Sequence, residues 1–303
     1  MKKIILFLLT TVFLALSFSF AKPNLPYVPS DSVPYVIITT NQAKSAYQVL
    51  ADWKTMKGTH TGVIEMSYIL DYFPGYDNAE KVRNYIKHMH DNFYTRWVLL
   101  GGDVSEVPTR YARVWLGGSG DLNAISDYYY SCLEGDWNYD EDSLWGELED
   151  SVDLNPQVYV GRIPTSNPDT VSYFINKLLS YEKNSPYLDY QTKALFLTSW
   201  INGDRSAQSL RDTLVTFLPY WFTQVNLDEY SSDEGIDSLN SGFGLIVNYS
   251  MSQHESNFIT LWNNRDNINN DSLNNLNNQH RFGVMLNSTC QNNAFNLDCI
   301  SKH

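Results

Sequence analysis

The sequence predicts an α/β fold whose strands form mostly parallel sheets flanked by helices. Short apolar runs rich in branched residues alternate with longer segments whose apolar residues recur at helical spacing. This alternation occurs twice, with a boundary between residues 184 and 191, which favours two subdomains. The length of 303 residues, with 43% hydrophobic and 18% charged residues, is typical of a globular chain of that size.

The first half should begin with strand, helix, strand, helix and strand in that order. The apolar runs 35–40, 62–66 and 97–100 predict the strands, and the amphipathic segments 42–57 and 78–93 predict the helices. Units of this kind are joined by right-handed crossovers, so the strands should be parallel.

The ends and inner faces of these two helices follow from single residues. Gly58 should end the first helix, and Asn78 should cap the second. The apolar positions expected to face the core are Ala46, Val49, Leu50, Trp53 and Met56 in the first helix and Val82, Tyr85, Ile86 and Met89 in the second.

The pattern is irregular from 104 to 155 and then becomes regular again. A strand at 158–164 and a helix at 169–183 complete the first half. A strand at 194–199, followed by a helix at 207–217, opens the second half. We therefore expect the same kind of α/β unit on both sides of the boundary.

The last sixty residues contain two predicted strands that each precede a potential catalytic residue. His254 follows the run 245–249, and Cys290 follows the run 282–287, with an Asn-rich helix predicted over 263–278. Ligand-binding groups in open α/β sheets lie beyond the carboxyl ends of the strands, so these side chains could meet as base and nucleophile. Taken singly, such a cysteine is more often a small buried hydrophobe, and such a histidine a surface or capping residue.

The first 21 residues predict a secretory signal peptide. They combine a basic start at Lys2 and Lys3, an apolar run over 4–20 and the small-x-small sequence Ser19-Phe20-Ala21. The run is short for a membrane-spanning helix, so a membrane anchor is the weaker alternative. We expect a secreted or cell-surface protein with no stable membrane insertion after cleavage, and a Pro/Ser-rich linker over 22–33.

Charge and cysteine content limit the partners. The net charge of −13 becomes −15 once Lys2 and Lys3 are removed with the signal. Such an acidic protein is not expected to bind nucleic acid, whose phosphates need Lys and Arg, but suits cation binding. Three cysteines are an odd number for an oxidising compartment, so one thiol should stay free. The pairing is open; a bridge between Cys132 and Cys299 would leave Cys290 free.

An acidic loop is a candidate calcium site. Its oxygen-bearing side chains occupy positions 1, 3, 5, 7 and 12, the spacing of an EF-hand-type loop. The predicted ligands are Asp136, Asn138, Asp140, Asp142 and Glu147. Position 6, where a glycine is expected, is Glu141, and no helices flank the loop, so a solvated acidic turn is the alternative.

Several stretches taken together resemble the gingipain family of secreted cysteine peptidases. Their order and spacing cover nearly the whole chain after the linker. The stretches are 35–40 (YVIITT), 50–58 (LADWKTMKG), 99–103 (LLGGD) with Val107-Pro108, 126–130 (SDYYY), 160–164 (VGRIP) and Tyr181-Glu182.

The resemblance implies a caspase-like three-layer sandwich with two subdomains, 34–185 and 186–303, and with the C-terminal part of the second missing. It implies that His254 and Cys290 form a catalytic dyad and that Asp127 borders the substrate pocket. The implied function is a secreted cysteine endopeptidase acting on protein or peptide substrates, and the resemblance also favours a structural calcium ion.

Two departures from the family pattern keep an alternative open. The family usually has Gly-His-Gly where this chain has Gln253-His254-Glu255, and often an acid where this chain has Gln157. The alternative is a catalytically inactive peptidase-like domain, or a calcium-dependent surface or binding module.

Overall fold

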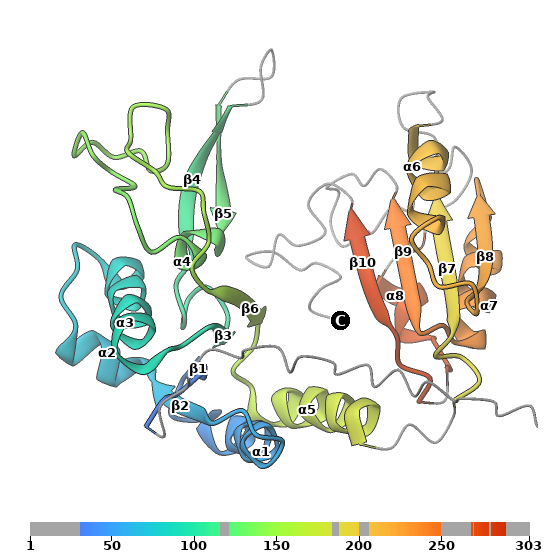
Figure 1. Cartoon of the computed structure of the whole chain (residues 1–303), viewed down its shortest axis with the longest axis horizontal. Coiled ribbons are helices and arrows are strands. Elements are labelled where there is room, and N and C mark those ends of the chain that lie inside the picture. Colours follow the sequence, from blue (N-terminus) through green and yellow to red (C-terminus); the bar gives the residue numbers. More distant parts are fainter. Residues whose placement is uncertain are drawn as a thin grey trace, which may run out of the picture. The chain divides into compact units, whose positions relative to one another are not determined.

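The computed structural model describes residues 31–115, 121–183, 188–199, 206–249, 268, 270–278 and 280–288. Within these ranges the chain forms two four-stranded parallel sheets and a two-stranded antiparallel ribbon (Figure 1). The predicted α/β class with mostly parallel strands is therefore confirmed. None of the helices in these ranges is long and apolar enough to cross a membrane.

The first sheet has the strand order β2-β1-β3-β6, and its strand pairs are parallel. Its strands are β1 (Tyr35–Thr39), β2 (Thr61–Glu65), β3 (Trp97–Gly101) and β6 (Tyr159–Ile163). Its helices are α1 (Lys44–Met56), α2 (Met66–Tyr72), α3 (Asn78–Phe93) and α5 (Pro168–Lys183). Each lies within about two residues of its prediction, except α2, which was not predicted.

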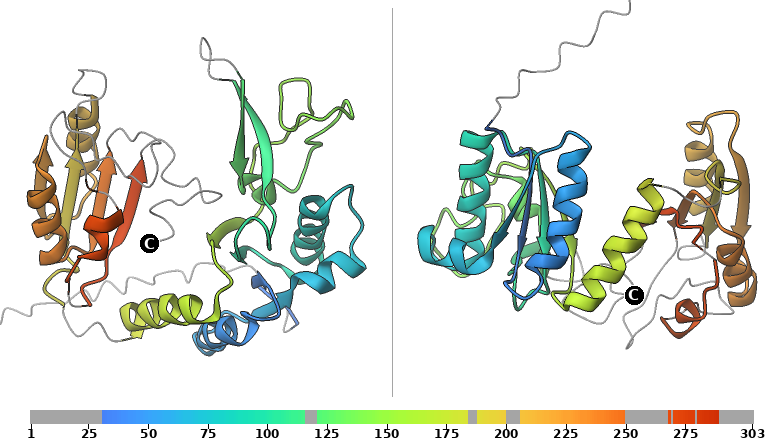
Figure 2. Two further views of the ribbon diagram at one scale, coloured as in Figure 1. Left: turned by 180° about the vertical axis from the view of Figure 1, so that it is seen from behind. Right: turned by 90° about the horizontal axis from the view of Figure 1, so that it is seen from below.

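Helices cover both faces of the first sheet, which gives this part of the chain three layers (Figure 2). One face packs Ile37, Leu99 and Ile163 against α1 and α5. The opposite face packs against α2 and α3 through Val36, Ile38, Val98 and Leu100. Successive residues of a strand point to opposite faces, and both faces are covered here, so these strands read as continuous apolar runs.

The buried face of α1 differs from the predicted one. Val49 and Met56 are 50% and 71% exposed, so their predicted inward orientation is wrong. The buried side chains are Ala46, Tyr47, Leu50 and Ala51. Tyr47 shifts the face because its ring packs in the core while its hydroxyl reaches the backbone oxygen of Thr165.

α3 begins at Asn78 as predicted, but its capping residue differs from the predicted one. Asp77, rather than Asn78, is the N-cap, and its carboxylate accepts a hydrogen bond from the backbone N–H of Glu80 at 2.9 Å. The helix ends at Tyr94, which adopts the left-handed conformation with φ of 60°. The buried positions Val82, Tyr85 and Ile86 were predicted correctly.

The irregular stretch after β3 contains regular elements that the sequence pattern did not reveal. β4 (Arg110–Trp115) and β5 (Asp121–Ser126) form the antiparallel ribbon, and the short helix α4 (Tyr128–Ser131) follows. Arg110 is almost fully buried, because Asp77 pairs with its guanidinium and the ring of Trp145 lies 3.5 Å from it. A buried arginine breaks the apolar alternation that would have predicted the strand.

The second sheet has the strand order β10-β9-β7-β8, and its strand pairs are also parallel. Its strands are β7 (Lys193–Thr198), β8 (Thr223–Asp228), β9 (Leu245–Tyr249) and β10 (Val284–Ser288). Its helices are α6 (Ser206–Val215), α7 (Ser232–Ser241) and α8 (Asn270–Asn274).

Two apolar clusters hold the second sheet. Leu195, Leu197 and Ile246 pack with residues of α7 and α8, and Phe196 and Val247 pack with residues of α6 on the other face. β8 and α7 were not predicted. The predicted helix 263–278 is represented in the described residues by α8 alone, and its first five residues lie outside them.

Candidate active site

The two strands that precede the predicted catalytic residues are neighbours in the second sheet. β9 and β10 pair in parallel, with Leu245 opposite Val284 at one end and Tyr249 opposite Ser288 at the other (Figure 1). Both strands therefore end at the same level on the carboxyl edge. His254 follows Tyr249 by five residues, and Cys290 follows Ser288 by two. His254 and Cys290 themselves lie outside the described residues.

Polar side chains tie neighbouring strands together at this carboxyl edge. Asn248 in β9 is fully buried, and its Nδ2 donates a hydrogen bond to Oδ1 of Asn287 in β10 at 2.6 Å. Between β7 and β8, the hydroxyl of Thr198 donates to Asp228, which also pairs with Arg211. The edge from which both predicted catalytic segments leave is thus fixed by side chains as well as by backbone pairing.

Asp127, the predicted substrate-binding residue, lies between β5 and α4, and its carboxylate is held by Arg162 of β6. The guanidinium donates to Oδ2 at 2.6 Å and to Oδ1 at 2.8 Å. It also donates to the backbone oxygens of Gly102, Val107 and Pro108 at 2.8 to 3.2 Å. A basic group of a substrate would have to share Asp127 with this buried arginine, and the substrate-binding role stays a prediction.

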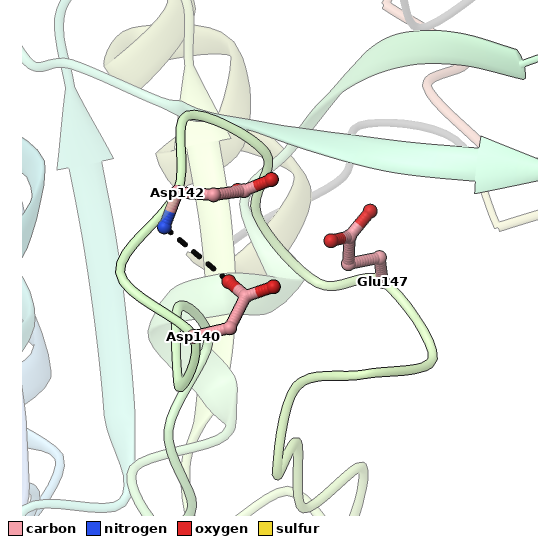
Figure 3. A group of neighbouring side chains, drawn as sticks. All are labelled: Asp140, Asp142 and Glu147. Carbon is pink, nitrogen blue, oxygen red and sulfur yellow. Dashed lines mark hydrogen bonds between the residues drawn. The ribbon is translucent and has the colours of Figure 1, made fainter.

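Three of the predicted calcium ligands lie together in the acidic loop (Figure 3). Ligand oxygens of Asp140, Asp142 and Glu147 all lie within 4.8 Å of one another. Among the described residues, Asp136 does not belong to this acidic group. Its Oδ1 instead accepts a hydrogen bond from the backbone N–H of Asn138 at 2.9 Å.

The backbone of the loop turns as a cation-binding loop requires. Glu141 occupies position 6 and has φ of 60°, the left-handed region that the usual glycine adopts easily. Asp150, which the sequence analysis missed, accepts N–H hydrogen bonds from Tyr139 at 2.6 Å, Gly146 at 2.8 Å and Glu147 at 3.2 Å. These bonds fold the loop back and place its last acid beside the earlier ones.

Two further side chains define the electrostatics of the acidic loop. Arg113 donates to Oε2 of Glu147 at 2.5 Å, so this carboxylate is already partly neutralised. Oδ1 of Asn138 is buried and has no hydrogen-bond partner. The residues present fit a hard cation held by oxygen ligands, with Glu147 shared between that cation and Arg113.

The comparison with protein families decides the assignment. The profile of peptidase family C25 matches residues 28–303. The chain belongs to peptidase family C25. This confirms the predicted membership of the gingipain family of cysteine peptidases. No curated protein matches the chain.

Solved structures with the fold of family C25 are similar to this chain over most of its length. A structure described as a protease has a TM-score of 0.66 at 18% identity, and the match covers 88% of this chain and 56% of the solved chain. The Arg-specific cysteine proteinase gingipain R (RgpB) has a TM-score of 0.64 at 18% identity, and the match covers 89% of this chain and 58% of the RgpB chain. The complex of Porphyromonas gingivalis RgpB pro- and mature domains has a TM-score of 0.64 at 17% identity, and the match covers 86% of this chain and 56% of the solved chain. This chain therefore spans little more than half of the solved chains, and identities this low show the shared fold alone.

Two residues considered from the sequence have structural roles in this family C25 chain. Cys132 is buried with a free thiol, and burial raises the pKa of that thiol. Cys299, its possible partner from the sequence, lies outside the described residues. Gln157 accepts from the backbone N–H of Leu133 at 2.6 Å and donates to the backbone oxygen of Asn155 at 2.7 Å. Its amide is thus engaged at both ends by the first half of the chain.

The sequence did contain a signal for the Asn248–Asn287 pair. Each of the two apolar runs carries one asparagine, and the two occupy equivalent positions, next to last in β9 and in β10. A polar residue at the same place in two otherwise apolar strands indicates that the two side chains meet when the strands pair in register.

Proposed function

We propose that this family C25 chain is a secreted cysteine endopeptidase that hydrolyses protein or peptide substrates, with Cys290 as the nucleophile and His254 as the base. The main support is the in-register parallel pairing of β9 and β10, in which Tyr249 lies opposite Ser288. The segments carrying the two residues therefore leave neighbouring points of one sheet edge, where ligand-binding groups of open α/β sheets are found.

The proposed chemistry needs only these two side chains and backbone donors. An unperturbed cysteine has a pKa of about 8.5 and is mostly protonated at neutral pH, so His254 must accept the thiol proton. The sulfur then attacks the carbonyl carbon of the scissile bond, and His254 returns the proton to the leaving amine. Water hydrolyses the thioester and restores the thiol. Each backbone N–H that holds the oxyanion would contribute about 3–4 kcal/mol.

Replacing the nucleophile tests the proposal. Cys290→Ser should abolish hydrolysis of a fluorogenic peptide library and leave the thermal unfolding midpoint unchanged, because serine is nearly the same size. Cys299→Ser is the matched control and should keep full activity. Activity retained in Cys290→Ser would contradict the assignment. An inactive wild-type chain would favour the alternative of a peptidase-like binding module.

We further propose that the acidic loop holds a structural calcium ion through Asp140, Asp142 and Glu147, with Asp136 and Asn138 as the other predicted ligands. The clustering of three carboxylates supports it, as does the left-handed Glu141. A bound cation would offset the repulsion between these carboxylates and would accept the buried oxygen of Asn138 as a ligand. Its role would be to stabilise the loop, because the described contacts of the loop are with the first half of the chain.

A further inference from the structure

We infer that Asn248 and Asn287 are a positioning pair, which sets the alignment of the two strands that carry the catalytic base and nucleophile. This inference rests on the proposed function, because it assigns the pair a role in that reaction. This role needs no contact of the amides with substrate or with the reacting atoms. They would act through the strand ends that lead to His254 and Cys290.

The geometry of the pair is specific. Asn248 and Asn287 are register partners on adjacent parallel strands, so their side chains point to the same face of the sheet. The hydrogen bond between them is 2.6 Å long, and Asn248 has no exposed surface. Its register partner on the other side is Leu197, which is also fully buried and belongs to the apolar cluster on this face.

Stability alone does not explain two amides at this place. A buried amide loses its hydrogen bonds to water, and one good bond to another amide only offsets that loss. Two apolar side chains of similar shape can be equally stable or more so, as is found when buried polar pairs are replaced together. A polar pair does add specificity, because any other alignment of the strands breaks the hydrogen bond between the two amides.

The alignment matters for the proposed reaction. A slip of β10 by one residue would turn Asn287 to the opposite face of the sheet and break its hydrogen bond with Asn248. It would also move every following residue by about 3.3 Å along the strand direction. Misplacement of a reacting group by about 1 Å can lower a rate about 10²-fold. The amide pair thus opposes the slip that would separate Cys290 from His254.

The test compares Asn248→Leu, Asn287→Leu and the double variant with the wild-type chain. Thermal unfolding reports stability, and peptide hydrolysis reports kcat and KM. The pH dependence of alkylation by iodoacetamide, with the modified residue located by mass spectrometry, reports the pKa of the Cys290 thiol. Thr198→Val is the matched control. It removes a buried hydrogen bond at the same edge, but between β7 and β8.

Each single variant should lower the unfolding midpoint, since it removes the hydrogen bond between the two amides. In all three, kcat should fall about 10²-fold with little change in KM, and the alkylation midpoint should move towards the free-thiol value of about 8.5. Thr198→Val should lower stability alone.

A double variant that keeps the wild-type kcat and alkylation profile would overturn the positioning role and leave the dyad intact. An alkylation midpoint near 8.5 in the wild-type chain would instead remove the dyad, and the positioning role with it.

Discussion

The two sheets of this chain share one strand order but end in different ways. When the strands are numbered within each sheet in chain order, both sheets have the order 2-1-3-4, with β1 and β3 central in the first and β7 and β9 central in the second. At the carboxyl edge of the first sheet, Thr39 donates to the backbone oxygen of Gly101 at 2.7 Å. At that of the second, the polar contacts join strands that continue into the predicted catalytic segments.

The two carboxyl edges differ in their polar contacts although the strand order is the same. Arg162 closes the first edge by binding Asp127 and three backbone oxygens, and Gln42 adds a bond to Ser166 at 2.9 Å. These polar groups are therefore hydrogen-bonded to other groups of the protein. At the second edge, the described polar contacts are the Asn248–Asn287 pair between β9 and β10 and the Thr198–Asp228 bond between β7 and β8. Strand order alone therefore does not identify a functional edge.

Removing the contacts of Arg162 at the carboxyl edge of the first sheet should have the largest effect on stability. Arg162→Met leaves the Asp127 carboxylate, whose side chain is 16% exposed, without its arginine partner, and losing one partner of a buried ion pair typically costs about 3–5 kcal/mol. Urea denaturation should show this loss, whereas Arg211→Met should cost less, because its partner Asp228 is 40% exposed. Equal losses for the two variants would show that the edges do not differ as described.

A smaller effect is expected from a methyl group at the end of β3. A Cβ at Gly101 would lie 2.5 Å from the Tyr47 ring, whereas one at Gly161 would meet nothing within 4 Å. Gly101→Ala should therefore destabilise the chain by about 1–3 kcal/mol, and Gly161→Ala should not. Comparable unfolding midpoints for the two variants would refute the close packing at the first edge.

Calcium should stabilise the loop inserted between β5 and β6 by about 1–1.5 kcal/mol at millimolar concentration, given the usual affinity of extracellular modules. The thermal midpoint should rise with calcium and fall with chelator. Asp140→Ala should reduce that rise, and the control Glu149→Ala, an exposed acid of the same loop outside the carboxylate group, should not. A midpoint insensitive to both calcium and chelator would identify the loop as a solvated acidic turn.

The smallest effect concerns the ion cluster between α1 and α5. Burial would raise the pKa of Glu182, but hydrogen bonds from Lys54, Lys57 and Trp53 lower it to about 2. A depressed carboxyl pKa stabilises the fold above the unfolded value of about 4.3, and that stability is lost as the pH falls towards 2. Glu182→Gln should flatten this acid dependence of the unfolding free energy, and an unchanged dependence would exclude the cluster as its source.

The sequence predicted the apolar elements of both halves better than the polar ones. β1, β3 and β9 are continuous apolar runs because helices cover both faces, and a single sequence contains that signal. β4 was missed because Arg110 is buried through contacts with Asp77 and Trp145, which lie far from it in sequence. α7 had a local signal, the capping box of Ser231 and Glu234, that the apolar pattern did not use.

The same limit applies to the sites. Carboxylate spacing predicted that Asp140, Asp142 and Glu147 would meet, but the pairing of Glu147 with Arg113 depends on a strand outside the loop. The spacing also gave no indication of Asp150, which folds the loop through three backbone bonds. Local spacing thus predicts which ligands can gather, whereas their neutralising partners come from tertiary packing.

The measurement that tests the central claim most directly is the pH dependence of Cys290 alkylation in the wild-type chain and in His254→Ala. If strands β9 and β10 bring the two residues together, the wild-type thiol should react with a midpoint well below the free-thiol value of about 8.5, and His254→Ala should return it to that value. The same midpoint in both chains, with both correctly folded, would contradict the dyad and with it the assignment of the second sheet as the catalytic edge.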